Sequence, residues 1–392
     1  MNAETKTPVA ETGYSNVLKA EEKQWIEEIW QKLDEKLQAV TLRSRGKFPF
    51  WTADGMHNDI KDTSINSWIN GFWPGLNWLM YIGTGNEEYK KTAEIGEELL
   101  DRALALPEHI SHDVGFIWML AARPDLELTG NHKSWQRLKV AASYLMGRLN
   151  PEAGYIRAWD WGRDNMEKVG WTIIDTMMNL PLLYWASEDC KDPRYRYAAM
   201  KHADMAMRDH IRPDGSVYHI VVHDTETGEA VEKRGLQGYG TESAWSRGQS
   251  WAIYGFTLCY LHTGKQEYLD VAKKVAHYFI AATCEDWLPK SDFRAPEEPV
   301  YFDSSAGLCA ACGMLELAKL VPDFEKRLYV HGAMKLLQNI EKHFADWSRD
   351  TDFIIGNSSG WYSKEQNVNI IYADYYFAEA VYKLKGFEPL FW

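Results

Sequence analysis

Two aspartates stand where apolar, helix-forming runs begin. Asp175 follows Ile174 inside one such run, and Asp113 follows His112 at the start of another. Burial among apolar residues raises the pKa of a carboxyl group, which suits it to donate a proton near neutral pH. Two carboxyl groups whose pKa values are pushed apart are typical of glycoside chemistry. The structural alternative is that each aspartate caps its helix, favours the helix dipole or is satisfied by buried partners.

An arginine and several aromatic residues accompany other apolar runs. Arg247 lies between Trp245 and Trp251. A guanidinium binds a carboxylate through two parallel hydrogen bonds, so Arg247 is a candidate clamp for an anionic substrate; the alternative is an ion pair with Glu242. Tryptophans near the start of the runs suggest surfaces for sugar rings, although a single tryptophan more often belongs to the core. They are Trp68, Trp73, Trp159 and Trp161.

A repeat along the chain positions these residues. A turn such as Thr84–Tyr89 or Thr263–Tyr268 recurs, and each copy is followed by an amphipathic stretch with apolar residues at helical spacing. Each copy is preceded by a run that is apolar nearly all round, which predicts a helix buried on every side. The buried runs are 67–82, 113–122, 172–186, 247–262, 304–319 and 370–384.

The order of the helices predicts a closed ring. The last buried run has no amphipathic successor, and the amphipathic stretch 21–40 has no buried predecessor. Pairing them gives an all-α (α/α)6 barrel, which we expect to form a single catalytic domain over residues 21–392 after an N-terminal arm of residues 1–20. Because long loops usually carry function, we expect the pocket at the end where the inner helices begin. The long connections there lie around 41–66, 151–170 and 211–245.

Composition excludes several classes of protein. Among 392 residues, 43 are Lys or Arg and 56 are Asp or Glu, for a net charge of −13, which argues against a nucleic-acid binder. No apolar run approaches the roughly 18 residues of a membrane span, and the polar first twenty residues do not resemble a signal peptide, so we expect a cytoplasmic protein. Five cysteines are too few for a disulfide scaffold. No HExxH, Walker or GxGxxG motif occurs.

Five motifs, in this order, resemble those of the unsaturated glucuronyl hydrolases, glycoside hydrolase family 88, over roughly residues 45–385. They are Trp68-Ile-Asn-Gly-Phe-Trp-Pro-Gly, His112-Asp-Val-Gly-Phe, Ile174-Asp-Thr-Met-Met-Asn-Leu, Trp245-Ser-Arg-Gly-Gln-Ser-Trp and Tyr372-Ala-Asp-Tyr-Tyr. The family has the (α/α)6 barrel and acts on oligosaccharides left by polysaccharide lyases, which begin with a 4,5-unsaturated uronic acid. The resemblance implies a glycosidase for small anionic oligosaccharides, foremost glycosaminoglycan disaccharides, without metal, organic cofactor, nucleic-acid or membrane partner.

The resemblance also assigns residues. Asp175 matches the catalytic aspartate, which protonates C4 of the enol ether and assists addition of water at C5, after which the hemiketal opens and the aglycone leaves. Asp113 matches a second essential carboxylate, which places the substrate and tunes Asp175. Trp159 is an alternative to the match at Trp161. The residues matching the subsite of the unsaturated sugar are Trp68, Trp161, His219, Gln237, Arg247 and Trp251.

A late segment departs from the family pattern. Some members that favour sulfated disaccharides carry Ser-x-x-Ser-x-Lys, whereas here the corresponding residues are Ser359, Tyr362 and Lys364, with Ser363 beside the missing second serine. Ser359 and Lys364 are candidate contacts for the aglycone or a sulfate group, or they belong to a Gly/Ser-rich loop without this role.

Three other functions fit parts of the sequence. An unsaturated rhamnogalacturonyl hydrolase has the same fold and similar chemistry on pectin fragments. A sugar 2-epimerase also uses an (α/α)6 barrel, but needs bases on both faces of the sugar ring. A carbohydrate-binding toroid would bind a sugar without catalysing a reaction. The sequence leaves the oligomeric state open.

Overall fold

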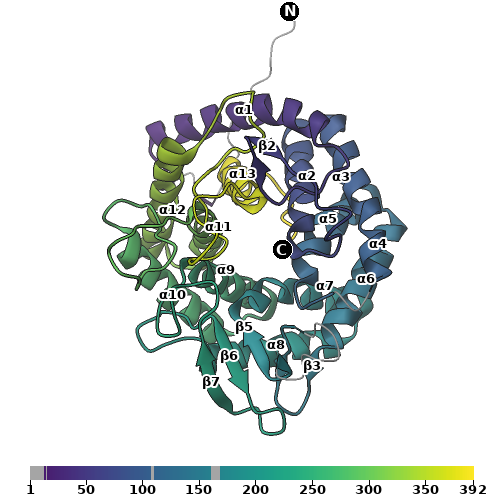
Figure 1. Cartoon of the computed structure of the whole chain (residues 1–392), viewed down its shortest axis with the longest axis vertical. Helices are drawn as coiled ribbons and strands as arrows, with labels where there is room; N and C mark the ends of the chain where they lie inside the picture. Colours follow the sequence, from purple (N-terminus) through teal and green to yellow (C-terminus); the bar gives the residue numbers. More distant parts are fainter. Residues whose placement is uncertain (1–12, 15, 107–109, 160–167) are drawn as a thin grey trace, which may run out of the picture.

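The computed structural model describes residues 13–14, 16–106, 110–159 and 168–392, in which helices form two concentric layers (Figure 1). Each inner helix from α2 to α11 packs on the outer helix that follows it. The inner layer is α2 (Phe72–Thr84), α5 (Val114–Thr129), α7 (Leu180–Cys190), α9 (Ser246–Thr263), α11 (Ser304–Leu320) and α13 (Ile371–Lys385). The outer layer is α1 (Ala20–Arg43), α3 (Glu87–Leu99), α6 (His132–Met146), α8 (Pro193–Asp209), α10 (Gln266–Thr283) and α12 (Asp323–Phe344). The predicted (α/α)6 barrel is confirmed.

The ring closes where the two ends of the chain meet. α13 packs against α11, α2 and α1. Trp30 of α1 lies against Phe387, which follows α13, with 5.0 Å between the ring centroids. The helix without a predecessor thus pairs with the helix without a successor, as the repeat predicts.

Side-chain composition explains which helices lie inside. Every residue of α11 from Ser304 to Ala318 is buried, because apolar or small side chains occupy all sides of this helix. An outer helix instead buries one stripe and exposes charged residues on the other side. The buried stripe of α10 consists of Tyr268, Leu269, Ala272, Val275, Ala276, Phe279 and Thr283.

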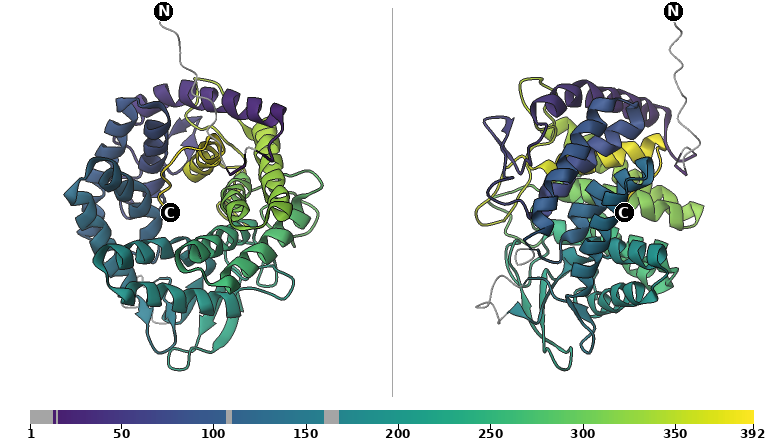
Figure 2. Two further views of the ribbon diagram at one scale, coloured as in Figure 1. Left: turned by 180° about the vertical axis from the view of Figure 1, so that it is seen from behind. Right: turned by 90° about the vertical axis from the view of Figure 1, so that its right-hand side faces the viewer.

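The connections differ at the two ends of the ring. Three of the inner helices that lead into an outer helix end at glycines in the left-handed region, Gly85, Gly130 and Gly264 at φ 72°, 73° and 67°, which allow an immediate turn. The long connections gather at the other end and carry short antiparallel strands (Figure 2). These are β1 (Thr52–Ala53) with β2 (Met56–His57), β3 (Leu149–Asn150) with β4 (Tyr155–Ile156), and the sheet of β5 (Trp171–Ile173), β6 (Ile220–His223) and β7 (Ala230–Arg234).

Three short helical segments complete the description. η1 (Trp68–Gly71) leads into α2, η4 (Ile174–Met178) leads into α7, and α4 (Asp101–Leu104) continues α3. Across the described part of the chain, no helix is both long and apolar enough to cross a membrane.

A network of buried charges lies among the later turns of the inner helices. Lys383 of α13 donates to Glu316 at 2.9 Å and to the hydroxyl of Tyr254 at 2.6 Å, and lies 3.1 Å from Glu379. The indole of Trp392 donates to Glu379 at 2.8 Å. These contacts bind α9, α11 and α13 to one another. The C-terminal end of the chain lies inside the ring (Figure 1), and Trp392 is buried there.

Candidate active site

The sheet at the loop-bearing end fixes Asp175. β5 pairs with β6, so that Ile173 lies opposite Ile220, and the next backbone amide, of Ile174, donates to the carbonyl of His219 at 3.1 Å. The chain then turns into η4, which carries Asp175. Its Oδ2 is 3.7 Å from Nε2 of His219, and it has no hydrogen-bond partner among the described residues.

A close approach between two inner helices brings Asp113 to the same place. A Cβ on Gly115 would lie 2.6 Å from Cα of Asn179, so only glycine lets α5 approach this closely. Asn179 then accepts a hydrogen bond from the amide of Phe116 at 2.9 Å and donates to the carbonyl of Asp175 at 3.2 Å. Asp113 and Asp175 therefore converge on one pocket, as their positions in the sequence predict.

Both carboxyl groups have raised pKa values. Burial, and secondly the charge of Asp113, raise the pKa of Asp175 to about 7, and the charge of Arg247 opposes this rise. Burial raises the pKa of Asp113 to about 6, although the hydroxyl of Ser111 donates to its Oδ2 at 2.9 Å and favours the charged form. Asp175 thus keeps its proton in a large share of molecules at neutral pH, as the sequence argument expects of an acid.

His219 is a buried neutral histidine beside the acid. Burial, followed by the charge of Arg247, lowers its pKa to about 3. Its Nδ1 accepts a hydrogen bond from the amide of Gln237 at 3.4 Å, which leaves the proton on Nε2, the nitrogen that faces Asp175. This ring nitrogen has no hydrogen-bond partner in the described protein.

Arg247 has a different partner from the one that the sequence suggests. Its guanidinium binds Asp303 at 2.5 Å rather than Glu242, and also donates to the carbonyls of Ser359 and Gly360, the latter at 2.9 Å. Three of the five N–H donors of the guanidinium are therefore engaged within the protein, and a substrate carboxylate would have to use the others or displace these contacts. The positive charge still forms part of the pocket wall.

The tryptophans predicted to stack on sugars separate into three cases. Trp68 lines the pocket, and so does Trp159. Trp161 lies outside the described residues. Trp251 does not take the expected place: it is 1% exposed and packs behind Trp68 and against Phe116, with centroid distances of 6.5 and 5.2 Å. It supports the stacking surface from behind, and its ring is not accessible to a sugar.

The two candidate aglycone residues also differ. Ser359 is fully buried, and its hydroxyl donates to the carbonyl of Phe302 at 2.9 Å, so the expectation of a substrate contact through this hydroxyl is wrong in this structure. Lys364 is exposed, with Nζ 4.3 Å from the ring centroid of Trp361. Trp361 borders the pocket, which puts Lys364 near its rim.

The pocket has a volume of about 580 Å³, within the range of small-ligand sites. Gln237 lines it as predicted, with Nε2 donating to the carbonyl of Gly360 at 3.2 Å. The rest of the wall was not predicted from the sequence. Two of its residues lie beside predicted ones: Ser111 directly precedes the His-Asp pair, and Trp361 lies in the same loop as Ser359. The residues that were not predicted are Ser64, Asn66, Ser67, Ser111, Lys168, Trp171, Ile173, Leu236 and Trp361.

Three comparisons bear on this geometry. Residues 43–261 match the model of Glycosyl Hydrolase Family 88. The unsaturated glucuronyl hydrolase of Bacillus sp. (strain GL1) is 34% identical over 380 residues, covering 93% of this chain and 99% of that protein. The unsaturated chondroitin disaccharide hydrolase of Streptococcus pyogenes serotype M1 is 32% identical over 374 residues, covering 93% of each. The solved unsaturated glucuronyl hydrolase of Streptococcus agalactiae superposes with a TM-score of 0.88 at 26% identity, covering 100% of this chain and 99% of that one.

Proposed function

Because this chain belongs to glycoside hydrolase family 88 and is a glycosidase, we propose that the pocket between Asp113 and Asp175 is its active site. The enzyme releases the 4,5-unsaturated uronic acid from the non-reducing end of oligosaccharides that polysaccharide lyases produce, with glycosaminoglycan products as the main substrates. The observation that carries the assignment of the site is the convergence of two buried carboxyl groups with raised pKa values in one pocket.

The reaction begins with proton transfer from Asp175. Its carboxyl proton passes to C4 of the enol ether, and positive charge develops at C5 and the ring oxygen. Water adds to C5, and its proton returns to the carboxylate of Asp175, which restores the acid. The hemiketal at C5 then opens and the aglycone leaves at C1. A pKa near 7 suits this cycle, because the same group must give and accept a proton at neutral pH.

The neighbours of Asp175 support the two states of this cycle. The negative charge of Asp113 raises the pKa of Asp175 before proton transfer and stabilises the cation that follows. The N–H group at Nε2 of His219 faces the carboxyl group of Asp175 at 3.7 Å. A small approach would let it donate a hydrogen bond to the carboxylate once Asp175 has transferred its proton.

The remaining wall binds the sugar. Trp68 and Trp159 offer aromatic faces to the unsaturated ring, and Gln237 supplies an amide. Arg247 attracts the uronate through its charge, which a protein of net charge −13 needs locally. Lys364 is the group at the rim that suits a sulfate on the aglycone, by electrostatic attraction.

A panel of lyase products tests this function. We expect unsaturated chondroitin or hyaluronan disaccharide to lose the ultraviolet absorbance of its C4=C5 bond when it is mixed with the protein. Unchanged absorbance with chondroitin, hyaluronan, gellan and pectin products would contradict the hydrolase. Turnover restricted to pectin products would identify an unsaturated rhamnogalacturonyl hydrolase instead.

We also propose that residues 21–392 act as one catalytic domain in the cytoplasm. Helices α1 to α13 contribute to one ring, which supports a single unit. The five cysteines are unpaired, and unpaired thiols are usual in reducing compartments. Fractionation of the producing cells, with the activity followed in each fraction, tests the location.

A further inference from the structure

Three tyrosines form a cluster outside the pocket described above. The ring of Tyr362 contacts Tyr239 at 5.2 Å and Tyr301 at 5.3 Å between centroids, with interplanar angles of 76° and 78°. An edge-to-face contact occupies at most one face of each ring. Tyr239 is 53% exposed, so this residue remains widely accessible to solvent beside the contact with Tyr362.

The cluster continues the pocket wall outward. Gln237, which lines the pocket, comes two residues before Tyr239, and Trp361, which also lines it, directly precedes Tyr362. The amide of Tyr362 donates to the carbonyl of Gln237 at 2.8 Å, so the two segments run beside each other. A ligand that leaves the pocket between Gln237 and Trp361 therefore meets the tyrosines next.

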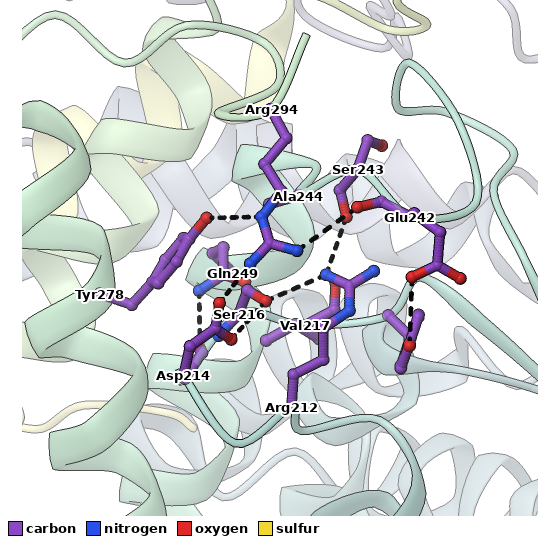
Figure 3. Close-up of polar contacts among 12 residues, drawn as sticks. Arg212, Asp214, Ser216, Val217, Glu242, Ser243, Ala244, Gln249, Tyr278 and Arg294 are labelled. Atoms are coloured by element: carbon purple, nitrogen blue, oxygen red, sulfur yellow. Dashed lines mark hydrogen bonds and ion pairs between the residues drawn. The ribbon is translucent and has the colours of Figure 1, made fainter.

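Buried polar groups hold the loop of Tyr239 in place. Asp292 is 1% exposed, and its carboxylate accepts hydrogen bonds from the amides of Tyr239 and Ala244 at 3.0 and 2.9 Å. Figure 3 shows the guanidinium groups of Arg212 and Arg294 beside the backbone that follows Tyr239, at Glu242 and Ser243. Arg212 donates to the carbonyl of Ser243 at 2.9 Å, and Arg294 donates to the carbonyl of Glu242 at 3.4 Å. A ring on a fixed loop binds a ligand with little loss of conformational freedom.

Tyrosine rings that served only to pack this loop would be expected to lie inside it. Here the loop is already fixed by Asp292 and the arginines, and the exposed ring of Tyr239 adds apolar surface at the mouth of a carbohydrate pocket. Rigid, partly polar aromatic rings of this kind are efficient contact surfaces because few rotatable bonds are frozen on binding.

We propose that Tyr239, Tyr362 and Tyr301 form an aromatic platform for those sugars of the substrate that lie beyond the first sugar of the aglycone. The platform rests on the proposed function, because it receives the far end of the same oligosaccharide. It makes an unsaturated tetrasaccharide a better substrate than the disaccharide with the same repeating unit.

The test compares hyaluronan-derived unsaturated disaccharide and tetrasaccharide as substrates, followed by loss of the double-bond absorbance. For Tyr239→Ala we expect KM for the tetrasaccharide to rise on the order of fivefold, with kcat unchanged and both constants for the disaccharide unchanged. Tyr239→Phe keeps the ring and is expected to behave as the parent. Tyr197→Ala is the matched control, since Tyr197 on α8 is 54% exposed and takes no part in the cluster.

The outcomes separate the platform from the function. A parent enzyme that consumes neither substrate contradicts the proposed function itself. If the parent consumes both, the platform is overturned when Tyr239→Ala leaves the tetrasaccharide unaffected or impairs the two substrates equally. It is also overturned when Tyr239→Phe costs as much as Tyr239→Ala, because the hydroxyl and not the ring would then make the contact.

Discussion

The ring encloses two groups of buried titratable residues, and these differ in whether their polar atoms have partners within the protein. In the network of Lys383, Glu316 and Glu379, the charged groups have protein partners between 2.6 and 3.1 Å. In the pocket, Oδ2 of Asp175 and Nε2 of His219 have none among the described residues. Buried polar atoms are normally paired, so these two atoms are available for hydrogen bonds with the proposed substrate.

The same contrast governs protonation. Burial alone would raise the pKa of Glu316, but the charges and hydrogen bonds of Lys383 and Lys319 together outweigh it and the pKa is lowered, so the carboxylate stays charged. At Asp175 burial and the charge of Asp113 outweigh the charge of Arg247, and the pKa rises to about 7. One set of contacts thus keeps a carboxyl group charged in the folded chain, and the other favours the protonated form that the proposed mechanism needs.

Replacing Asp175 should give the largest effect on activity and little loss of stability. We expect Asp175→Asn to lower kcat by about 10²- to 10⁴-fold or more, because the acid is lost. The urea midpoint should stay the same or rise, since an unpaired buried carboxyl is removed. Absorbance kinetics and equilibrium unfolding measure the two effects. A variant that is both active and strongly destabilised would place Asp175 in the structural group.

Replacing Lys383 should give the opposite pattern. Lys383→Met leaves Glu379 buried without its counter-charge and leaves Glu316 with Lys319 alone, so we expect the free energy of unfolding to fall by about 3–5 kcal/mol. The kinetic constants of the molecules that remain folded should be unchanged. Lys385→Met is the control, because Lys385 pairs with the half-exposed Glu27 and its loss should matter much less. Altered KM in folded Lys383→Met would break the separation of the two groups.

Arg247 belongs to both groups, so its replacement should have a mixed effect. Arg247→Ala removes a cation from the pocket and leaves Asp303 buried without its counter-charge. We expect kcat/KM to fall by a factor that corresponds to a loss of about 2–5 kcal/mol of transition-state stabilisation. Since Arg247 lowers the pKa of Asp175, the alkaline limb of the pH profile should also move to higher pH. Near-normal kinetics would remove Arg247 from substrate binding, and an unmoved limb would show that its charge does not act on Asp175.

The smallest expected effect is a shift in the pH profile of activity, which should follow the pKa of Asp175 and not that of the Lys383 network. Asp175 binds its proton more tightly in the folded protein, where its pKa is about 7, than in the unfolded chain, where a free aspartate has a pKa of 3.8. Its contribution to stability is therefore present at low pH and is lost as the pH rises between these two values. Activity should likewise fall as pH rises through about 7. Asp113→Asn removes the nearby negative charge and should move this limb to lower pH, while Arg247 and His219, which also face Asp175, stay in place. Profiles of kcat/KM at constant ionic strength measure the shift.

The sequence predicts the fold, and it predicts that Asp113 and Asp175 line one pocket, for physical reasons. Helical periodicity separates inner from outer helices, because burial on all sides requires apolar residues on all sides. Asp113 and Asp175 both stand at the start of inner helices, and neighbouring starts lie side by side in the ring. Their convergence therefore follows from the order of elements alone.

Other parts of the site depend on information that a local pattern lacks. A helix that is apolar all round does not indicate which side faces the pocket, so Trp251 was expected in the wall and lies behind it. The partner of Arg247, Asp303, is 56 residues away in sequence, and no spacing rule connects them. The loop that brings Trp361 to the wall is held in part by Arg247, which donates to the carbonyls of Ser359 and Gly360 from 112 and 113 residues away in sequence.

The closure of the ring has a consequence for synthesis. The contacts that complete the barrel join α1 (Ala20–Arg43) to α13 (Ile371–Lys385), so the first helix has no permanent neighbour on one side until the last has been made. At about 5–20 residues per second, the ribosome needs roughly 15 to 65 seconds to cover that interval. During this time the apolar stripe of α1 is exposed to other chains and to chaperones. The yield of folded enzyme should therefore depend on how well a cell protects its nascent N-terminal half.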